Sequence, residues 1–166
     1  MLLLTGPTAA GKNTVARILA RRMSRCAVVD FDLVRAMFVQ PHRAPWQGDE
    51  GRAQQVLGIR HVAQLALGFH AAGWQTIILD VVVNETLPLY RESLEAVPLC
   101  VVQLLPSFEE TRRRFYARGP VLTDAEFAHV YRDQDAFHLA DLRLDTTHID
   151  PETTATRVAP FLTPRR

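Results

Sequence analysis

Lys12 is the only lysine of this chain, since the other 18 of its 19 Lys+Arg residues are arginine. It lies in a segment with the spacing of a phosphate-binding P-loop, Gly6-Pro7-Thr8-Ala9-Ala10-Gly11-Lys12-Asn13-Thr14. An ammonium is a compact point charge that fits between phosphates, whereas a planar guanidinium is too wide for the same nest of backbone N–H groups. We therefore expect this loop to bind the phosphates of a nucleotide, with Lys12 reaching between them.

The residue after the lysine departs from the usual P-loop pattern. A serine or threonine normally stands there and binds Mg²⁺. Here the residue is Asn13, and the threonine follows as Thr14. Because an asparagine carbonyl oxygen can also bind a hard cation, the sequence predicts a magnesium site and leaves open which of the two residues is the ligand.

Two carboxylates, Asp30 and Asp32, follow the second apolar segment of the chain. Residues just beyond the carboxyl ends of parallel strands line the ligand crevice, and the P-loop leaves the first strand at the same edge. We predict that both contact the acceptor, and that Asp32 accepts a proton from its hydroxyl as a phosphoryl group arrives. The alternative is that Asp32 only caps a helix beginning at Leu33.

A third carboxylate, Asp80, ends the apolar run Ile77-Ile78-Leu79 and gives it the form of a Walker B segment. An aspartate in this position can hold Mg²⁺, usually through water, or meet the acceptor. The next residue is Val81 and not glutamate. The chain therefore lacks the adjacent carboxylate with which motor ATPases activate water.

Basic and aromatic residues of three further segments are candidates for the same site. Arg114 and Arg118 are four residues apart on a predicted helix that ends at Gly119, so they share a face and could clamp a transferring phosphate. The alternative is a solvated basic face that complements the C-terminus of the helix. Arg43 and Trp46, in a proline-rich loop, are candidates for closing over the acceptor. We predict that the loop near 40–50 and a lid near 114–136 are mobile.

The elements that must position these residues alternate along the chain. Five apolar segments predict strands at Leu2–Thr5, Cys26–Asp30, Thr76–Asp80, Leu99–Leu105 and Leu142–Thr146. Helical spacing predicts helices at about 13–24, 32–39, 50–72, 86–96, 107–118 and 151–162, the last with Asp150 as its N-cap. Continuous apolar strands separated by helices indicate a parallel α/β sheet covered on both faces.

The composition of the chain disfavours several classes of function. The chain has 166 residues, is 48% hydrophobic and has a formal net charge of +1, which fits one globular domain and gives no argument for nucleic acid or a membrane surface. Cys26 and Cys100 lie in apolar runs and are predicted to be buried free thiols. The start of the chain predicts a strand and no signal peptide, so we expect a cytoplasmic protein. A GTPase is disfavoured, because its guanine-reading Asn-Lys-x-Asp motif needs a second lysine.

Together these motifs resemble the small P-loop kinases, such as shikimate, gluconate and adenylate kinases, and most of all the chloramphenicol phosphotransferase-like group. The late run Asp145-Thr146-Thr147-His148 supports the likeness to that group. The resemblance implies a single-domain P-loop NTPase with strand order 2-3-1-4-5, ATP and Mg²⁺ as cofactors, a hydroxyl acceptor, Asp32 as the base, and Arg114 and Arg118 in the lid.

Three hypotheses follow for the activity. The first is an ATP-dependent kinase that phosphorylates a hydroxyl of a small molecule such as an antibiotic, a sugar or a nucleoside. The second is a nucleotide-binding regulatory module with little turnover, suggested by Asn13 at the usual metal-ligand position. The third, a nucleic-acid end kinase, rests only on the basic run Arg112–Arg114 and is disfavoured by the near-neutral charge.

Overall fold

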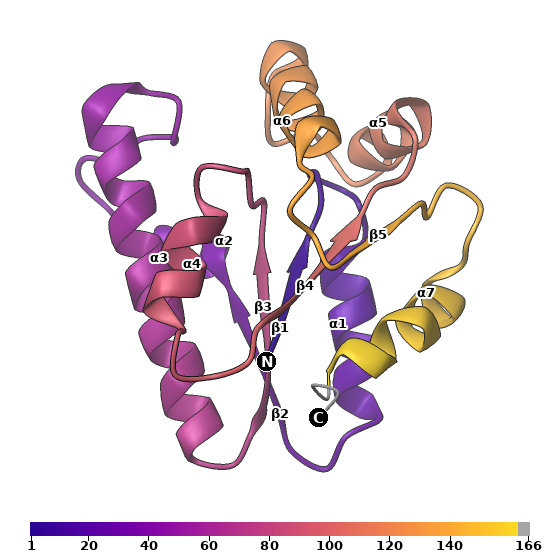
Figure 1. The fold of residues 1–166 in the computed structure, drawn as a ribbon. Coiled ribbons are helices and arrows are strands. Elements are labelled where there is room, and N and C mark those ends of the chain that lie inside the picture. Colours follow the sequence, from indigo (N-terminus) through magenta and orange to yellow (C-terminus); the bar gives the residue numbers. More distant parts are fainter. Residues whose placement is uncertain (163–166) are drawn as a thin grey trace.

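The computed structural model describes residues 1–162 and shows five parallel strands in the order β2-β3-β1-β4-β5 with helices around them (Figure 1). The strands are β1 (Leu2–Thr5), β2 (Cys26–Asp30), β3 (Gln75–Asp80), β4 (Cys100–Leu104) and β5 (Leu142–Leu144). This confirms the predicted α/β class and strand order.

The helices alternate with the strands. They are α1 (Lys12–Arg21), α2 (Phe31–Arg35), α3 (Gly48–Ala71), α4 (Leu87–Ser93), α5 (Phe108–Ala117), α6 (Asp124–Ala136), α7 (Pro151–Val158) and the short 3₁₀ turn Ala159–Phe161. No helix among residues 1–162 has the length and hydropathy needed to span a membrane.

The central strands are buried on both faces, which is why their sequences are continuously apolar. Leu3 of β1 packs into a core with residues of α3 and α4, including Ile59 and Tyr90. Its neighbours Leu2 and Leu4 point to the other face and pack with residues of α1 and α7. Successive side chains of the strand are thus buried on opposite faces, and the sheet lies between two layers of helices.

Several predicted boundaries need correction. β5 ends at Leu144 and not at Thr146, because the Asp145 side chain accepts hydrogen bonds from the N–H and hydroxyl of Thr147 and turns the chain. α2 ends at Arg35, earlier than predicted. Cys26 and Cys100 are free but only half buried.

The structure adds one helix that the predicted helix ranges do not include, α6, which lies in the segment predicted as a lid. Thr123 caps this helix by accepting a hydrogen bond from the Glu126 N–H, while the Glu126 carboxylate accepts one from the Thr123 N–H. This capping box precedes apolar residues at helical spacing, Phe127 and Val130. The signal for the helix was therefore present in the sequence.

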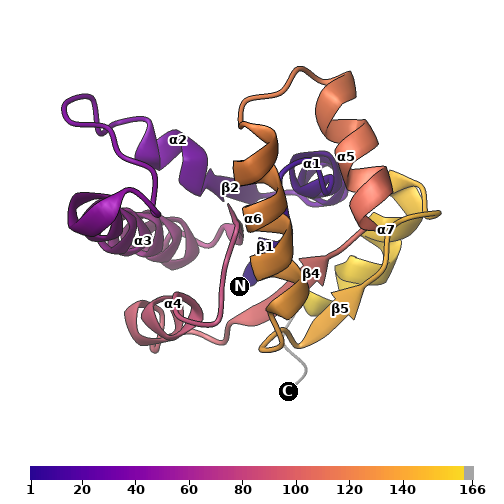
Figure 2. The ribbon, with the colours of Figure 1, turned by 90° about the horizontal axis from the view of Figure 1, so that it is seen from above.

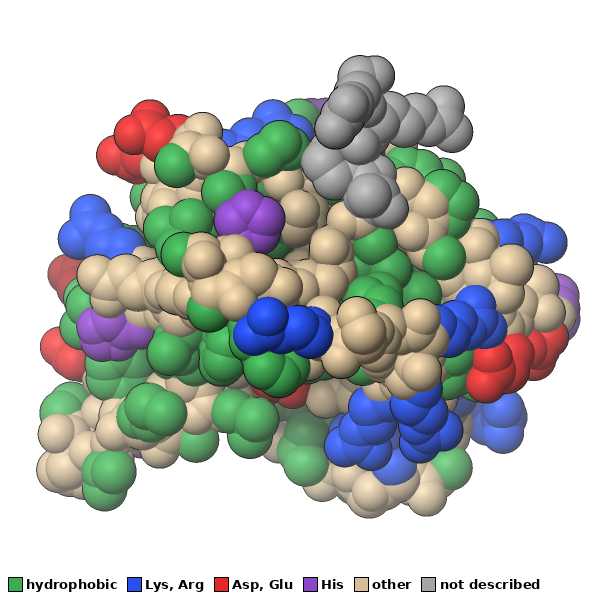
Figure 3. All heavy atoms as spheres, turned by 90° about the horizontal axis from the view of Figure 1, so that it is seen from below, with side chains coloured by type: hydrophobic (Ala, Val, Ile, Leu, Met, Phe, Trp, Pro, Cys, Tyr) green, Lys and Arg blue, Asp and Glu red, His purple; other side chains and the backbone are tan. Residues whose placement is uncertain are grey.

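The two ends of the sheet have different surroundings. Seen from above, α6 crosses the carboxyl end of the sheet, with α2 and α3 on one side and α5 on the other (Figure 2). The opposite end shows charged side chains of both signs interspersed with hydrophobic ones (Figure 3). The elements that could enclose a ligand are gathered at the carboxyl end.

Candidate functional site

The P-loop joins β1 to α1 in a backbone conformation that its small residues permit. Gly6, Ala9 and Gly11 all have positive φ angles, of 149°, 69° and 100°. A Cβ on Gly6 would lie 2.3 Å from the Leu104 carbonyl oxygen, so only glycine fits there. Gly11 caps α1 without a side-chain hydrogen bond, which leaves the N-terminal N–H groups of that helix available to an anion.

Lys12 folds back over this loop. Its Nζ donates hydrogen bonds to the carbonyl oxygens of Gly6 (2.7 Å) and Pro7 (3.2 Å). Burial lowers the pKa of Lys12, and the nearby carboxylates of Asp32 and Asp80 act in the opposite direction. The ammonium therefore lies between a loop that can hold phosphates and a pair of carboxylates.

A cavity of about 740 Å³ extends from the P-loop to α2, α3 and α6. Its charged lining is of both signs: Lys12, Arg35, Arg52 and Arg118 oppose Asp30, Asp32, Asp80, Glu126 and Asp133. The cavity also takes in Thr8, Ala9, Ala10, Gly11, Asn13 and Thr14, so every predicted nucleotide-binding residue except Gly6 lines it. Gly6 contributes the carbonyl oxygen that holds Lys12.

Asp30 and Asp32 take different positions in this cavity. Asp30 caps α2, because its Oδ1 accepts a hydrogen bond from the Asp32 N–H (3.0 Å), and its Oδ2 accepts one from the Asn13 amide (2.8 Å). Capping by Asp32 is therefore wrong, and Asp30 performs that role. No hydrogen bond or ion pair within residues 1–162 occupies the Asp32 carboxylate, which faces the cavity free to meet a ligand.

Asp80 is buried where β3 ends, with 9% of its surface exposed. The Tyr90 hydroxyl donates to its Oδ2 (2.7 Å), and the Val81 N–H donates to its Oδ1 (2.6 Å). Burial raises the pKa of Asp80 to about 7, against the opposing effect of these two hydrogen bonds. A cation bound nearby would favour the charged form.

The oxygens at this edge fit a magnesium ion held largely by phosphates and water. Asn13 directs its amide N–H at Asp30, and Thr14 and Asp80 line the same cavity. Within residues 1–162 no group of three or more His, Cys, Asp or Glu could hold a metal. Mg²⁺ bound with a nucleotide commonly uses only one or two protein ligands besides phosphates and water, and Asn13, Thr14 and Asp80 line the cavity where such ligands would be needed.

Arg114 and Arg118, the two arginines predicted in the lid, make different contacts. Arg118 lines the cavity and acts electrostatically on Lys12. Arg114 does not line it: its Nε donates to Glu110 (2.7 Å) and its guanidinium donates to the Thr146 carbonyl oxygen (3.1 Å). Arg114 thus joins α5 to the chain after β5, and only Arg118 is placed to meet a phosphate.

Of the two arginines Arg35 and Arg43, the structure brings Arg35 and not the predicted Arg43 to the cavity. The Arg43 side chain is exposed and does not line the cavity. Its carbonyl oxygen instead accepts a hydrogen bond from Arg35, which does line the cavity. The Arg35 Nε is buried without a hydrogen-bond partner, and within residues 1–162 Arg35 makes no ion pair. Nothing in the spacing of Arg35 singled it out, because it follows Asp32 on α2 as an ordinary helical residue.

The loop near 40–50 and α6 meet across the cavity. Trp46 lines it and lies edge-on to His129 of α6, with ring centroids 6.0 Å apart. Gln54 of α3 anchors the loop through hydrogen bonds to the Arg43 N–H (3.0 Å) and the Pro41 carbonyl oxygen (2.8 Å). His148, which follows the last strand, is exposed and does not line the cavity.

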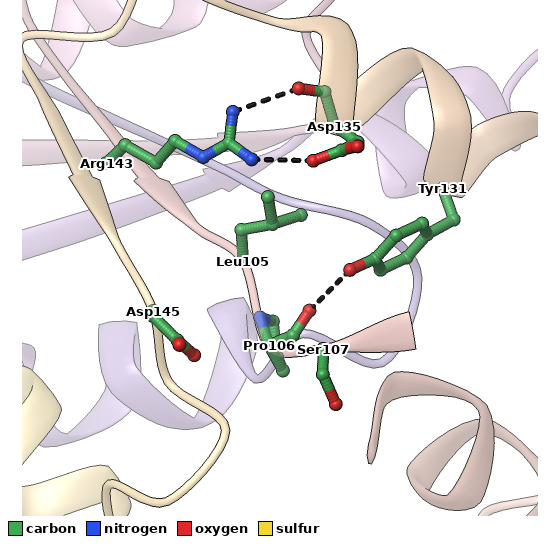
Figure 4. Close-up of a pocket in the computed structure, with 7 residues that line it drawn as sticks. All are labelled: Leu105, Pro106, Ser107, Tyr131, Asp135, Arg143 and Asp145. Atoms are coloured by element: carbon green, nitrogen blue, oxygen red, sulfur yellow. Dashed lines mark hydrogen bonds and ion pairs between the residues drawn. The ribbon is translucent and has the colours of Figure 1, made fainter. Parts of the chain in front are cut away.

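A second pocket, of about 450 Å³, lies at the β5 edge of the sheet (Figure 4). Its lining residues are Leu105, Pro106, Ser107, Tyr131, Asp135, Arg143 and Asp145. Arg143 donates to the Asp135 carboxylate (2.6 Å) and carbonyl oxygen (2.9 Å), and Tyr131 donates to the Pro106 carbonyl oxygen (2.9 Å). Its polar groups are therefore largely engaged with one another.

Solved structures share this architecture at low sequence identity. A sugar kinase from Janibacter sp. HTCC2649 is 20% identical, with 97% of this chain and 92% of that chain covered and a TM-score of 0.72. APS kinase from Mycobacterium tuberculosis, in complex with AMPPNP and APS, is 18% identical, with 97% and 95% covered and a TM-score of 0.69. Shikimate kinase from Acinetobacter baumannii, in complex with shikimate, is 21% identical, with 95% and 89% covered and a TM-score of 0.64.

No protein-family model and no curated protein matches the chain. The chain has the fold of the P-loop kinases, which confirms at the level of the fold the resemblance stated from its motifs.

Proposed function

We propose that this protein is an ATP-dependent kinase that transfers the γ-phosphoryl group to a hydroxyl of a small molecule. The observation that carries the proposal is the single cavity that joins the P-loop and Lys12 to the unoccupied carboxylate of Asp32. Neighbours of the same fold that are named as kinases support it. The predicted cytoplasmic location and the mobility of the loop and lid stay predictions.

Mg²⁺-ATP, when bound, supplies the phosphoryl group and the charge neutralisation that the metal gives. Lys12 and the N–H groups of the P-loop would hold the β- and γ-phosphates, with Asn13 or Thr14 and Asp80 near the metal. Asp32 would take the proton of the acceptor hydroxyl as its oxygen bonds to phosphorus and the bond to the ADP oxygen breaks. Arg118 would neutralise charge on the transferring group.

The guanidinium of Arg35 is a candidate for recognising the acceptor. Its guanidinium has one hydrogen bond to a backbone carbonyl and no carboxylate partner within residues 1–162. Arg35 lies on α2, three residues after Asp32, and lines the same cavity. We infer that Arg35 binds the acceptor and not the nucleotide.

The test is transfer from γ-³²P-ATP with Mg²⁺ to a panel that includes glucose, gluconate, shikimate, adenosine and chloramphenicol. We expect labelled product with at least one compound, and a rate reduced about 10²–10⁴-fold in Asp32→Asn. Intact ATP binding without transfer to any hydroxyl compound would favour the regulatory module suggested by Asn13.

A further inference from the structure

Gln134 is a buried polar residue in the last turn of α6, with none of its surface exposed. Its Nε2 donates to the Val82 carbonyl oxygen (2.5 Å), and its Oε1 accepts from the Thr5 hydroxyl (3.3 Å). Its backbone carbonyl oxygen accepts from the Gln103 amide (2.5 Å). One residue of the helix is thus bonded to the ends of β1 and β4 and to the segment after β3.

The partners of Gln134 adjoin the catalytic groups. Thr5 immediately precedes Gly6 of the P-loop, and its hydroxyl also accepts a hydrogen bond from the Val82 N–H (2.9 Å). Val82 is two residues beyond Asp80, and both its N–H and its carbonyl group are held by this network. The position of the chain after Asp80 is therefore coupled to α6.

The same helix forms a wall of the cavity. Glu126, His129, Val130 and Asp133 of α6 line it. His129 meets Trp46 of the opposite wall edge-on. A displacement of α6 would therefore move these groups relative to Asp80 and the P-loop.

An apolar side chain could fill the space of Gln134 but could not replace its hydrogen bonds. The Val82 carbonyl group would be left buried and unpaired, which is costly in a low-dielectric interior. The structure would then relieve the cost by moving α6 or the segment after Asp80 until water reaches these groups.

We propose that Gln134 is a positioning residue, which holds the last turn of α6, and with it one wall of the cavity, in place relative to Asp80 and the P-loop. Its kinetic consequence rests on the proposed kinase function. Its structural consequence, the position of α6, does not.

The experiment compares Gln134→Met and Gln134→Glu with Gln64→Met, which makes the same change as the first variant at an exposed position of α3. Glutamate has the size of glutamine but, when ionised, lacks the donor for the Val82 carbonyl oxygen, so this variant is measured at a pH high enough to ionise a buried carboxyl. The primary measurement is the emission of Trp46 in a Trp74→Phe background. Both Gln134 variants should shift this emission to longer wavelength, raise its quenching by acrylamide, and speed hydrogen exchange in residues 124–136 at least tenfold.

The second measurement is kinetic and uses whichever compound of the panel is phosphorylated. The KM for that acceptor should rise roughly 10- to 100-fold in the Gln134 variants, whereas the affinity for AMPPNP should stay within about twofold. Gln64→Met should behave like the parent in every measurement.

The outcomes separate the two proposals. If the Gln134 variants lose stability but keep the parent Trp46 emission and α6 exchange rates, Gln134 serves folding alone and the inference is overturned. If Trp46 and α6 respond as expected but no compound is phosphorylated, the positioning role stands and the kinase function fails. A fall in AMPPNP affinity as large as the rise in acceptor KM would also contradict the inference.

Discussion

The large cavity and the β5-edge pocket open at the same end of the sheet. They differ in whether their charged side chains are paired within the protein. In the β5-edge pocket Arg143 is held by Asp135 through two hydrogen bonds. In the large cavity, within the part of the chain that the structure describes, the Asp32 carboxylate has no hydrogen bond or ion pair and the buried Arg35 Nε has no hydrogen-bond partner. A buried polar group left unpaired is costly unless a ligand completes it, which applies to the Arg35 Nε, whereas Asp32 is exposed and its carboxylate is simply available to a ligand. The comparison supports the proposal that the ligand binds in the large cavity and not in the β5-edge pocket.

Of the substitutions considered, Lys12→Ala should reduce phosphoryl transfer in the large cavity the most. We expect phosphoryl transfer to fall by about 10³-fold or more, because the charge that spans the phosphates is lost. Lys12→Arg should not restore it, since a guanidinium does not fit the loop. Circular dichroism should show an unchanged fold, and a rate close to that of the parent would contradict the role given to Lys12.

Asp32→Asn tests the unpaired carboxylate. Transfer should slow about 10²–10⁴-fold through loss of the general base, with nucleotide affinity preserved. Steady-state kinetics together with calorimetry separates the two effects. Transfer at the parent rate would mean that another group accepts the proton.

Asp80 should make the stability of the nucleotide-free protein depend on pH. Its pKa is raised to about 7 in the folded state, so burial of the charged form penalises folding more as pH rises from about 4 to about 7. Asp80→Asn removes this penalty, and in EDTA its free energy of unfolding should gain roughly 2–4 kcal/mol on the parent over that range. Denaturant titrations of both proteins at pH 4–8 check this, and parallel stability curves would contradict it.

Arg35→Gln and Arg143→Gln compare the two regions directly. Loss of Arg35 should raise the KM for the acceptor about 10- to 100-fold, because an acceptor group would lose its charged partner. The Arg143 pair is about half exposed, so its loss should cost less than about 1 kcal/mol of stability and leave transfer unchanged. Equal kinetic effects of the two substitutions would remove the distinction between the pockets.

Much of this arrangement was predictable because it depends on local pattern. Apolar runs buried on both faces gave the strands, and the glycine spacing gave the P-loop before Lys12. The end of each strand also placed Asp32 and Asp80 at one edge, where the structure has them beside the same cavity.

The features of the site that could not be predicted from the sequence are those that depend on where side chains point. Arg43 and Arg35 are both arginines near Asp32, but only the path of the loop decides which enters the cavity. Tyr90 and Gln134 reach their partners across distances in sequence that no spacing rule covers. The α6 helix is different, because its capping box, Thr123 followed by Glu126, is a helix-start signal present in the sequence itself.

The central claim is that Lys12 and its loop bind a nucleoside triphosphate in the large cavity. Calorimetric titration of the protein with Mg²⁺-ATP tests it without any knowledge of the acceptor. The account predicts saturable binding at one site per chain, weakened at least tenfold in Lys12→Ala and unchanged in Arg143→Gln. Absence of binding by the folded parent protein, or equal affinity in all three proteins, would contradict it.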